Sequence, residues 1–213
     1  MKLLLTSNGV CNQSLADALS EMVGKQPKDI KIGFIPTAAD IDVGNKDWYI
    51  KQFTDLQKFG FEQIDIVEIA AEFVDWQGKL ADRDVVYAGG GNPYYLLAMM
   101  RRIKFDEWLK PELDKKIYVG GSSGSIVMTP SINVAKIKSY GSENVPDLDD
   151  LSAFGLVDFE VGPHIPDWPS QEEATEYAKT TSNKFYAIDN ESGVQVLDDK
   201  VKIISEGKWK EYA

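Results

Sequence analysis

Two short apolar segments that run directly into glycines set the strongest limit on the fold of this chain of 213 residues. Residues 84–88 lead into three glycines at 89–91, and residues 117–119 lead into two more at 120–121. Each segment has the length and composition of a buried strand, and a helical pattern follows each glycine turn. Repeated units of strand, tight turn and helix build a parallel sheet, so this pattern predicts an α/β fold.

The rest of the chain continues this alternation. Short apolar runs predict strands at 2–5, 30–35, 64–69, 84–88, 117–119 and 156–161. Apolar positions at helical spacing predict helices at 14–23, 47–59, 93–102, 105–113 and 171–180. The helix at 47–59 is expected to turn Trp48, Tyr49, Phe53 and Leu56 inward.

The predicted architecture has three layers, with a mainly parallel sheet and helices on both of its faces. Three further segments at 185–188, 194–197 and 201–204 are expected to close the structure as antiparallel strands. The polar stretch 131–150 is expected to form a long loop or a weak hairpin beside the site. Without a repeat or a linker, residues 1–213 are predicted to form a single α/β domain.

The composition narrows the classes of partner. A formal net charge of -11 argues against nucleic acid and anionic membranes, whose phosphates would be repelled. Cys11 is the only cysteine, so neither an internal disulfide nor a metal site of four Cys and His ligands is expected, and no cofactor is predicted. The apolar run at 2–5 is too short for a signal peptide or a membrane span. These features predict a cytoplasmic monomer or homodimer.

The strongest chemical signal is Gly120-x-Ser122-x-Gly124, between a predicted strand and a short apolar helix. A nucleophile elbow requires this context, because the serine sits on a strained turn and side chains two positions away would clash. The motif makes Ser122 a candidate nucleophile. A glycine-rich turn in which the serine only caps the helix is an equally good interpretation of the motif taken alone.

The loop Gly89-Gly90-Gly91-Asn92 is the second signal. Backbone N–H groups of Gly90, Gly91 and Asn92 can approach an oxyanion closely, since no Cβ blocks the glycines. Hydrolases commonly combine such an N–H with that of the residue after the nucleophile, here Ser123. The loop matches neither the dinucleotide fingerprint nor the P-loop, so a phosphate site is not favoured.

His164 is the only histidine and therefore the only imidazole that could activate Ser122. Such a base needs a third group that orients it, normally a carboxylate. One candidate follows the histidine, Glu191 in a predicted turn. Four candidates precede it: Asp147, Asp149, Asp150 and Asp158. Spacing alone does not choose among them.

Four motifs in this order resemble the dipeptidase E (α-aspartyl dipeptidase) and cyanophycinase family of serine peptidases, peptidase family S51. They are Phe34-Ile35-Pro36-Thr37-Ala38, Gly89-Gly90-Gly91-Asn92 followed by an aromatic residue and Leu-Leu, Gly120-x-Ser122-x-Gly124, and Pro163-His164. The resemblance covers most of the chain. It implies a fold like that of class I glutamine amidotransferases.

The resemblance also implies a Ser-His-Glu triad of Ser122, His164 and Glu191, with oxyanion N–H groups from Gly91 and Ser123. The implied activity is hydrolysis of short peptides through an acyl-enzyme. The family usually has alanine where this chain has Ser123, a small change that keeps the backbone N–H.

One departure from the family concerns specificity. In the aspartyl dipeptidases an arginine after the histidine reads the acidic side chain of the substrate, whereas residues 165–178 here contain no Arg or Lys. Lys136 and Lys138 are the only basic residues between Ser122 and His164. They are the nearest candidates to pair with a substrate carboxylate, although solvated lysines on a loop are the favoured interpretation.

Three other interpretations remain open at this point. An esterase of the α/β-hydrolase kind would place its acid before its histidine. A flavodoxin-like binding protein could hold a phosphate at Thr6-Ser7-Asn8-Gly9. A catalytically inactive relative of the glutamine amidotransferases is the third, although those enzymes carry cysteine at the elbow.

Overall fold

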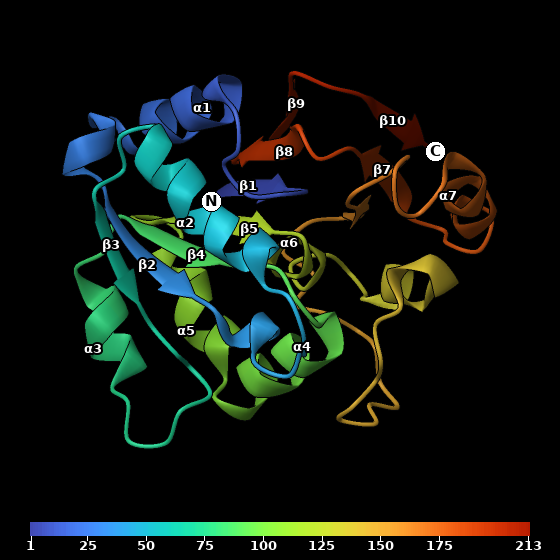
Figure 1. Ribbon diagram of the computed structural model, residues 1–213, viewed down its shortest axis with the longest axis horizontal. Helices are drawn as coiled ribbons and strands as arrows, with labels where there is room; N and C mark the ends of the chain where they lie inside the picture. The colour runs from blue at the N-terminus through green and yellow to red at the C-terminus, as the bar shows by residue number, and fades with distance from the viewer.

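The computed structural model describes residues 1–213 and contains two sheets (Figure 1). The main sheet has seven strands in the order β3-β2-β4-β5-β1-β8-β9. Their bounds are β1 Lys2–Thr6, β2 Lys31–Ile35, β3 Gln63–Ile66, β4 Val85–Ala88, β5 Ile117–Gly121, β8 Ser192–Leu197 and β9 Lys200–Ser205. Neighbours from β3 to β1 pair in parallel, and β8 and β9 add an antiparallel edge. The predicted α/β fold with a mainly parallel sheet is confirmed.

Helices cover both faces of this sheet. The bounds are α1 Gln13–Val23, α2 Asp47–Lys58, α3 Trp76–Ala81, α4 Pro93–Arg102, α5 Phe105–Glu112, α6 Ser123–Ile126 and α7 Gln171–Ala178. Helices α1 and α2 lie on one face, and α4 and α5 lie on the other (Figure 1). Side chains along β1 point alternately to the two faces of the sheet, and both sets are apolar. Leu4 lies in the core under α1 and α2, whereas Leu3 and Leu5 lie in the core on the opposite face, so both faces must be covered.

A smaller sheet has the order β10-β7-β6, with β6 at Phe159–Gly162, β7 at Lys184–Ile188 and β10 at Trp209–Tyr212. The prediction that 185–188 would be one of a set of closing antiparallel strands is therefore wrong in part. Strand β7 pairs in parallel with β6 and antiparallel with β10. A wholly buried apolar run such as β7 does not reveal its partner, and β10 is too exposed to show a strand pattern.

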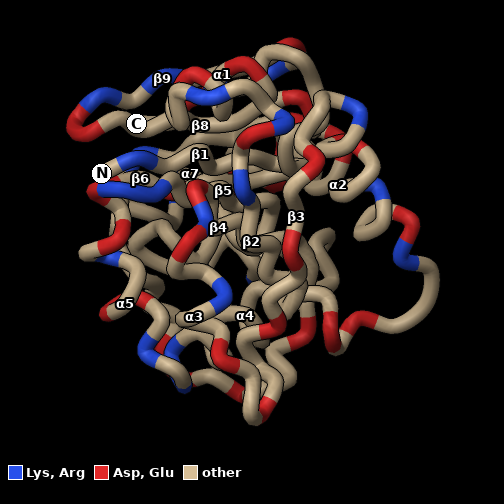
Figure 2. Tube along the Cα trace, turned by 90° about the vertical axis from the view of Figure 1, so that its left-hand side faces the viewer, with Lys and Arg blue, Asp and Glu red and all other residues tan.

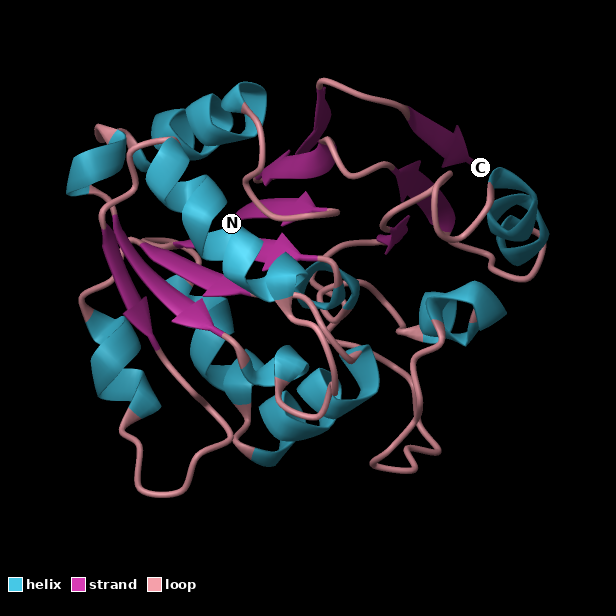
Figure 3. Cartoon of the chain, viewed as in Figure 1, coloured by secondary structure: helices cyan, strands magenta, loops and turns pink.

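The polar stretch 131–150 is a long connection rather than a hairpin (Figure 3). It holds only two 3-10 turns, Asn133–Lys136 and Lys138–Tyr140. Tyr140 is buried and its hydroxyl donates to the carbonyl oxygen of Pro163 at 2.7 Å. This contact ties the connection to the residue before His164, so the segment lies beside the site as expected.

Trp48 does not face the core as predicted. Its side chain is 37% exposed, and the buried residues of α2 are Gln52, Asp55 and Leu56. Trp48 lies in the first turn of α2, and there it lines an open cleft instead of packing under the sheet. Apolar spacing identified the helix but did not identify which of its aromatic residues face a ligand site.

Charged residues of both signs are spread over the helices and loops of the side drawn in Figure 2. No helix combines the length and the apolar character that crossing a bilayer requires.

Candidate active site

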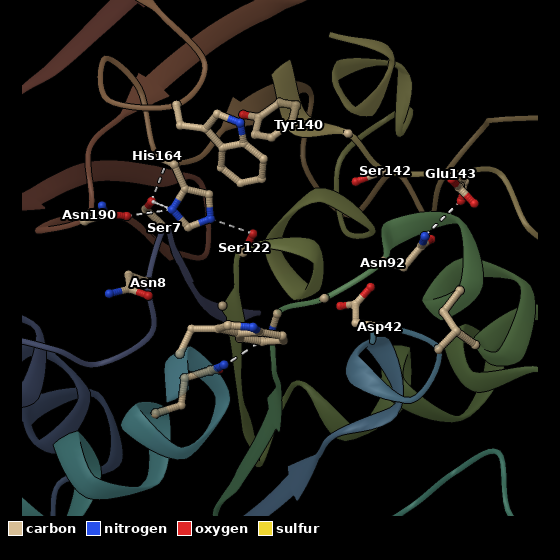
Figure 4. A pocket seen from close by; sticks show the side chains of 18 of the residues that line it. Ser7, Asn8, Asp42, Asn92, Ser122, Tyr140, Ser142, Glu143, His164 and Asn190 are labelled. Carbon is tan, nitrogen blue, oxygen red and sulfur yellow. Dashed lines mark hydrogen bonds between the residues drawn. The ribbon is translucent and has the colours of Figure 1, made fainter. Parts of the chain in front are cut away.

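Ser122 occupies a strained turn between β5 and α6. Its backbone lies at φ 50° and ψ -109°, a conformation that L-residues rarely adopt. A Cβ on Gly120 would come within 2.6 Å of the backbone of Gly124, and one on Gly124 would lie 2.1 Å from the carbonyl oxygen of Ala88. Both glycines are therefore sterically required, as in a nucleophile elbow. The turn projects the Ser122 side chain into the cleft (Figure 4).

Gly124→Ala should destabilise the fold by about 1–3 kcal/mol, because the new methyl group overlaps the β4 backbone. Urea unfolding measures the effect. Gly24→Ala is the matched control: nothing lies within 4 Å of its Cβ, and its φ of 76° alone costs about 1 kcal/mol. A Gly124→Ala protein as stable as wild type would contradict the close approach of α6 to β4.

His164 lies between β6 and α7 and points its ring at Ser122. Its Nε2 is 2.9 Å from Ser122 Oγ, within reach for proton transfer (Figure 4). Its backbone N–H donates to Ser7 Oγ at 2.8 Å. The sequence motif Thr6-Ser7-Asn8-Gly9, considered above as a phosphate loop, thus contributes a hydroxyl that holds the histidine in place.

The third group is an amide and not the expected carboxylate. His164 Nδ1 lies 2.6 Å from Asn190 Oδ1 and 3.3 Å from Ser7 Oγ. Glu191 is exposed, and its carboxylate makes neither a hydrogen bond nor an ion pair. None of Asp147, Asp149, Asp150 and Asp158 lines the cleft. The structure therefore places Asn190, and not the predicted Glu191, against the ring of His164.

The turn after β7 explains this one-residue difference. Asp189 Oδ1 accepts from the backbone N–H of Glu191 at 3.1 Å and from the Ser192 hydroxyl at 2.6 Å. These bonds fix the turn so that Asn190 faces the ring and Glu191 faces solvent. An Asn can perform the orienting task, as the Cys-His-Asn arrangement of papain-like proteases shows. A carboxylate is the usual partner of such a histidine, so the sequence pattern predicts neither Asn190 nor Ser7 in this place.

The accepting oxygen of Asn190 selects the useful tautomer of His164. With the proton on Nδ1, the lone pair of Nε2 faces Ser122 and can accept its proton. Burial lowers the pKa of His164 below its usual 6.5, while the Asn190 hydrogen bond and the charge of Asp167 act in the opposite direction. The base is therefore neutral at a lower pH than a carboxylate partner would allow.

The pH profile of kcat/KM should accordingly rise with a midpoint below about pH 6.5 and be flat above neutrality, since only neutral His164 accepts a proton. Rates from pH 4.5 to 9 on one neutral substrate test this. A midpoint well above pH 7 would show a charged partner at Nδ1 and would favour Glu191 after all.

Two backbone amides, one in the glycine loop and one directly after Ser122, have no hydrogen-bond acceptor within the chain. The N–H groups of Gly91 and Ser123 donate no hydrogen bond within the chain, whereas that of Gly90 reaches Gln52 Oε1 at 3.4 Å. The Ser123 hydroxyl donates to the carbonyl oxygen of Gly91, so the two loops are tied together. Free amides at a helix start and a glycine loop are suited to bind an oxyanion.

Asn92 has a structural place in the site. Its backbone N–H donates to the carbonyl oxygen of Ala38 at 2.7 Å, and its Oδ1 caps α4 at the N–H of Tyr95. Its Nδ2 donates to the carbonyl oxygen of Glu143 at 2.8 Å. All its groups near the cleft are engaged, so Asn92 positions the glycine loop and the 141–145 segment rather than donating to an oxyanion.

A cleft of about 710 Å³ opens above Ser122 and His164. Its aromatic lining comes from Trp48, Tyr140 and Trp168. Lys136 and Lys138 do not line it; they border a different hollow together with Glu160 and α7. The idea that either lysine pairs with a substrate carboxylate at Ser122 therefore has no support in the structure.

Comparison with known proteins gives one consistent family. The model of peptidase family S51 matches residues 3–204. An uncharacterized peptidase of Pasteurella multocida is 30% identical over 81% of this chain and 84% of its own length. Peptidase E of Streptomyces coelicolor is 26% identical over 98% of this chain and 79% of its own length.

Solved structures agree on the fold. A protein of Listeria monocytogenes EGD-e, described as a candidate peptidase E, superposes with a TM-score of 0.80 at 22% identity. That match covers 97% of this chain and 98% of the Listeria chain. A peptidase from an acI-B1 actinobacterium gives a TM-score of 0.62 at 17% identity, over 99% of this chain and 93% of its own.

Proposed function

Because this chain belongs to peptidase family S51, we propose that it hydrolyses short peptides through an acyl-enzyme on Ser122. One observation carries the proposal. The Ser122 hydroxyl, on a strained elbow, lies 2.9 Å from the imidazole of the only histidine and beside two unengaged amides. Nucleophile, base and oxyanion donors are the complete set that acyl transfer requires.

The proposed reaction proceeds in two halves. His164 Nε2 takes the proton of Ser122 as Oγ attacks the peptide carbonyl, and the N–H groups of Gly91 and Ser123 stabilise the oxyanion. The imidazolium then gives that proton to the departing amine, which leaves an ester on Ser122. Water attacks this ester, with His164 again as the base, and the acid product departs. Asn190 holds the ring throughout.

The shape of the cleft favours small substrates. Residues 140–143 and Val145 form one of its walls, and Asn92 ties that wall to the glycine loop through Glu143. A folded protein would have to thread an extended segment past this wall, whereas a peptide of two or three residues fits the enclosed volume. We therefore propose dipeptides and similarly short peptides as the substrates.

A serine-directed reagent tests the nucleophile without knowledge of the substrate. Diisopropyl fluorophosphate should add one diisopropylphosphoryl group to Ser122 with loss of fluoride, and mass spectrometry of the peptide spanning 117–128 should locate it. Labelling should abolish cleavage of a mixed dipeptide library. Labelling elsewhere, or rapid digestion of unfolded casein by the untreated protein, would contradict the nucleophile and the size limit respectively.

A further inference from the structure

The charged residues that line the cleft are all acidic. Its 21 lining residues include Asp42, Glu143 and Asp167 but no lysine or arginine. None of these three carboxylates accepts a hydrogen bond or joins an ion pair, although 13 ion pairs occur elsewhere in the chain. Unpaired carboxylates beside a developing oxyanion raise the energy of the transition state unless a cation neutralises them. No lysine or arginine lines the cleft, so a cation on the substrate is the partner that these carboxylates suit.

Asp42 is the carboxylate best placed to meet such a cation. It is half-buried, follows the Thr37–Ala39 turn, and points into the cleft on the side of Ser122 away from His164 (Figure 4). The backbone of Ala38 packs directly on the glycine loop, where a Cβ on Gly91 would lie 2.2 Å from its carbonyl oxygen. The segment that leads to Asp42 is therefore packed against the glycine loop, and Asp42 lines the same cleft as Gly91 and Ser122.

The nearest lysine does not neutralise Asp42. Lys46 Nζ donates to the carbonyl oxygen of Ala39 at 2.6 Å and forms no ion pair with Asp42. Burial raises the pKa of Asp42, and the charge of Lys46 opposes that rise. A carboxylate that is kept partly from water and has no hydrogen-bond partner in the chain is suited to pair with a cationic ligand.

Trp48, which lines the same cleft as Asp42, adds an independent feature. A Cβ on Gly90 would lie 3.8 Å from the six-membered ring of Trp48 and 3.3 Å from Ser122 Cβ, so the indole stands beside the nucleophile. This large aromatic side chain is 37% exposed. An exposed indole together with an unpaired carboxylate forms a site that suits an ammonium or guanidinium group.

The reaction geometry assigns this site to one half of the substrate. His164 protonates the leaving amine, so the leaving group lies on its side of Ser122 and the acyl residue lies on the other side. We propose that Asp42 and Trp48 bind a cation carried by the acyl residue of the substrate; this proposal rests on the proposed function. Substrates with an acidic acyl residue are then rejected. Two sources share this chemistry: the α-ammonium of an N-terminal residue and a basic side chain.

Four p-nitroanilides with one leaving group distinguish these sources at pH 7. Lysyl-p-nitroanilide carries both cations, leucyl-p-nitroanilide only the α-ammonium, N-acetyl-lysyl-p-nitroanilide only the side-chain cation, and N-acetyl-leucyl-p-nitroanilide neither. We expect kcat/KM to be on the order of 10- to 100-fold higher for a cationic substrate than for the uncharged one. Whichever single cation retains the advantage identifies the source. Aspartyl-p-nitroanilide should be cleaved more slowly than its leucyl counterpart.

Asp42→Asn should remove that advantage, mainly by raising KM for the cationic substrates. Asp40→Asn is the matched control, since Asp40 is exposed and does not line the cleft. The control should keep the wild-type preference. Equal rates on charged and uncharged substrates in wild type, or an undiminished preference in Asp42→Asn, would overturn the proposal.

Labelling with diisopropyl fluorophosphate distinguishes a failure of the cation site from a failure of the nucleophile assignment. Diisopropyl fluorophosphate is uncharged, so it should modify Ser122 equally in wild type, Asp42→Asn and Asp40→Asn. If Ser122 is labelled but no cationic anilide is cleaved, the cation site is wrong and the nucleophile stands. If Ser122 is not labelled and the cationic preference is nonetheless lost in Asp42→Asn, the cation site stands and the nucleophile is wrong.

Discussion

Replacing Ser122 with alanine is expected to lower kcat by a factor on the order of 10⁴ to 10⁶, with the free energy of unfolding close to that of wild type. The loss is large because, in the proposed mechanism, Ser122 and His164 act as one unit, and without the hydroxyl no ester can form. Residual hydrolysis would come from the oxyanion donors acting on bound substrate. Turnover of the best dipeptide from the library and urea unfolding are the two measurements.

Ser125→Ala is the matched control for this change. The Ser125 hydroxyl is buried in α6 and donates to the carbonyl oxygens of Thr6 at 2.7 Å and Gly120 at 2.9 Å. Its removal should cost about 1 kcal/mol or more of stability and leave kcat nearly unchanged. If Ser125→Ala loses turnover and Ser122→Ala keeps it, the elbow does not carry the nucleophile.

Prediction from the sequence succeeded where the order of residues within a short segment determines its backbone geometry. Gly120 and Gly124 flank Ser122 at the spacing of an elbow, where a Cβ at either position would meet backbone atoms, and the glycine loop directly follows a strand. The parallel sheet followed from the same strand–glycine–helix units. In each case the constraint acts within a few residues, so the pattern is readable without tertiary contacts.

Prediction from the sequence failed where contacts between distant segments determine which residues form the site. Ser7 comes from the loop after β1 and meets His164 across a separation of 157 residues. The choice between Asn190 and Glu191 depends on how Asp189 fixes a turn, which spacing cannot show. Trp48 carries the same apolar signal as a core residue, yet it is exposed and lines the cleft. Ser7, Asn190 and Trp48 line the cleft, and only the folded structure places them there.

Asn190 should be the group whose loss most affects the base. Asn190→Ala is expected to lower kcat on the order of 100-fold, because the ring of His164 loses the acceptor that fixes its tautomer and its angle to Ser122. Glu191→Gln, one residue further on, is the matched control and should keep the wild-type rate and pH profile. The reverse result, with Glu191 essential and Asn190 dispensable, would restore the carboxylate triad.

Asn190→Asp gives a second, signed outcome. A carboxylate at Nδ1 favours the imidazolium, so the rise of kcat/KM with pH should move to higher pH than in wild type, whereas Glu191→Gln should not move it. The direction of this pH shift matters because Asp42, Glu143 and Asp167 already line the cleft, and no lysine or arginine lines it. One more negative charge beside the ring would keep His164 protonated near neutral pH. An amide orients the same tautomer without adding that charge, which is a physical reason for asparagine in a cleft as acidic as this one.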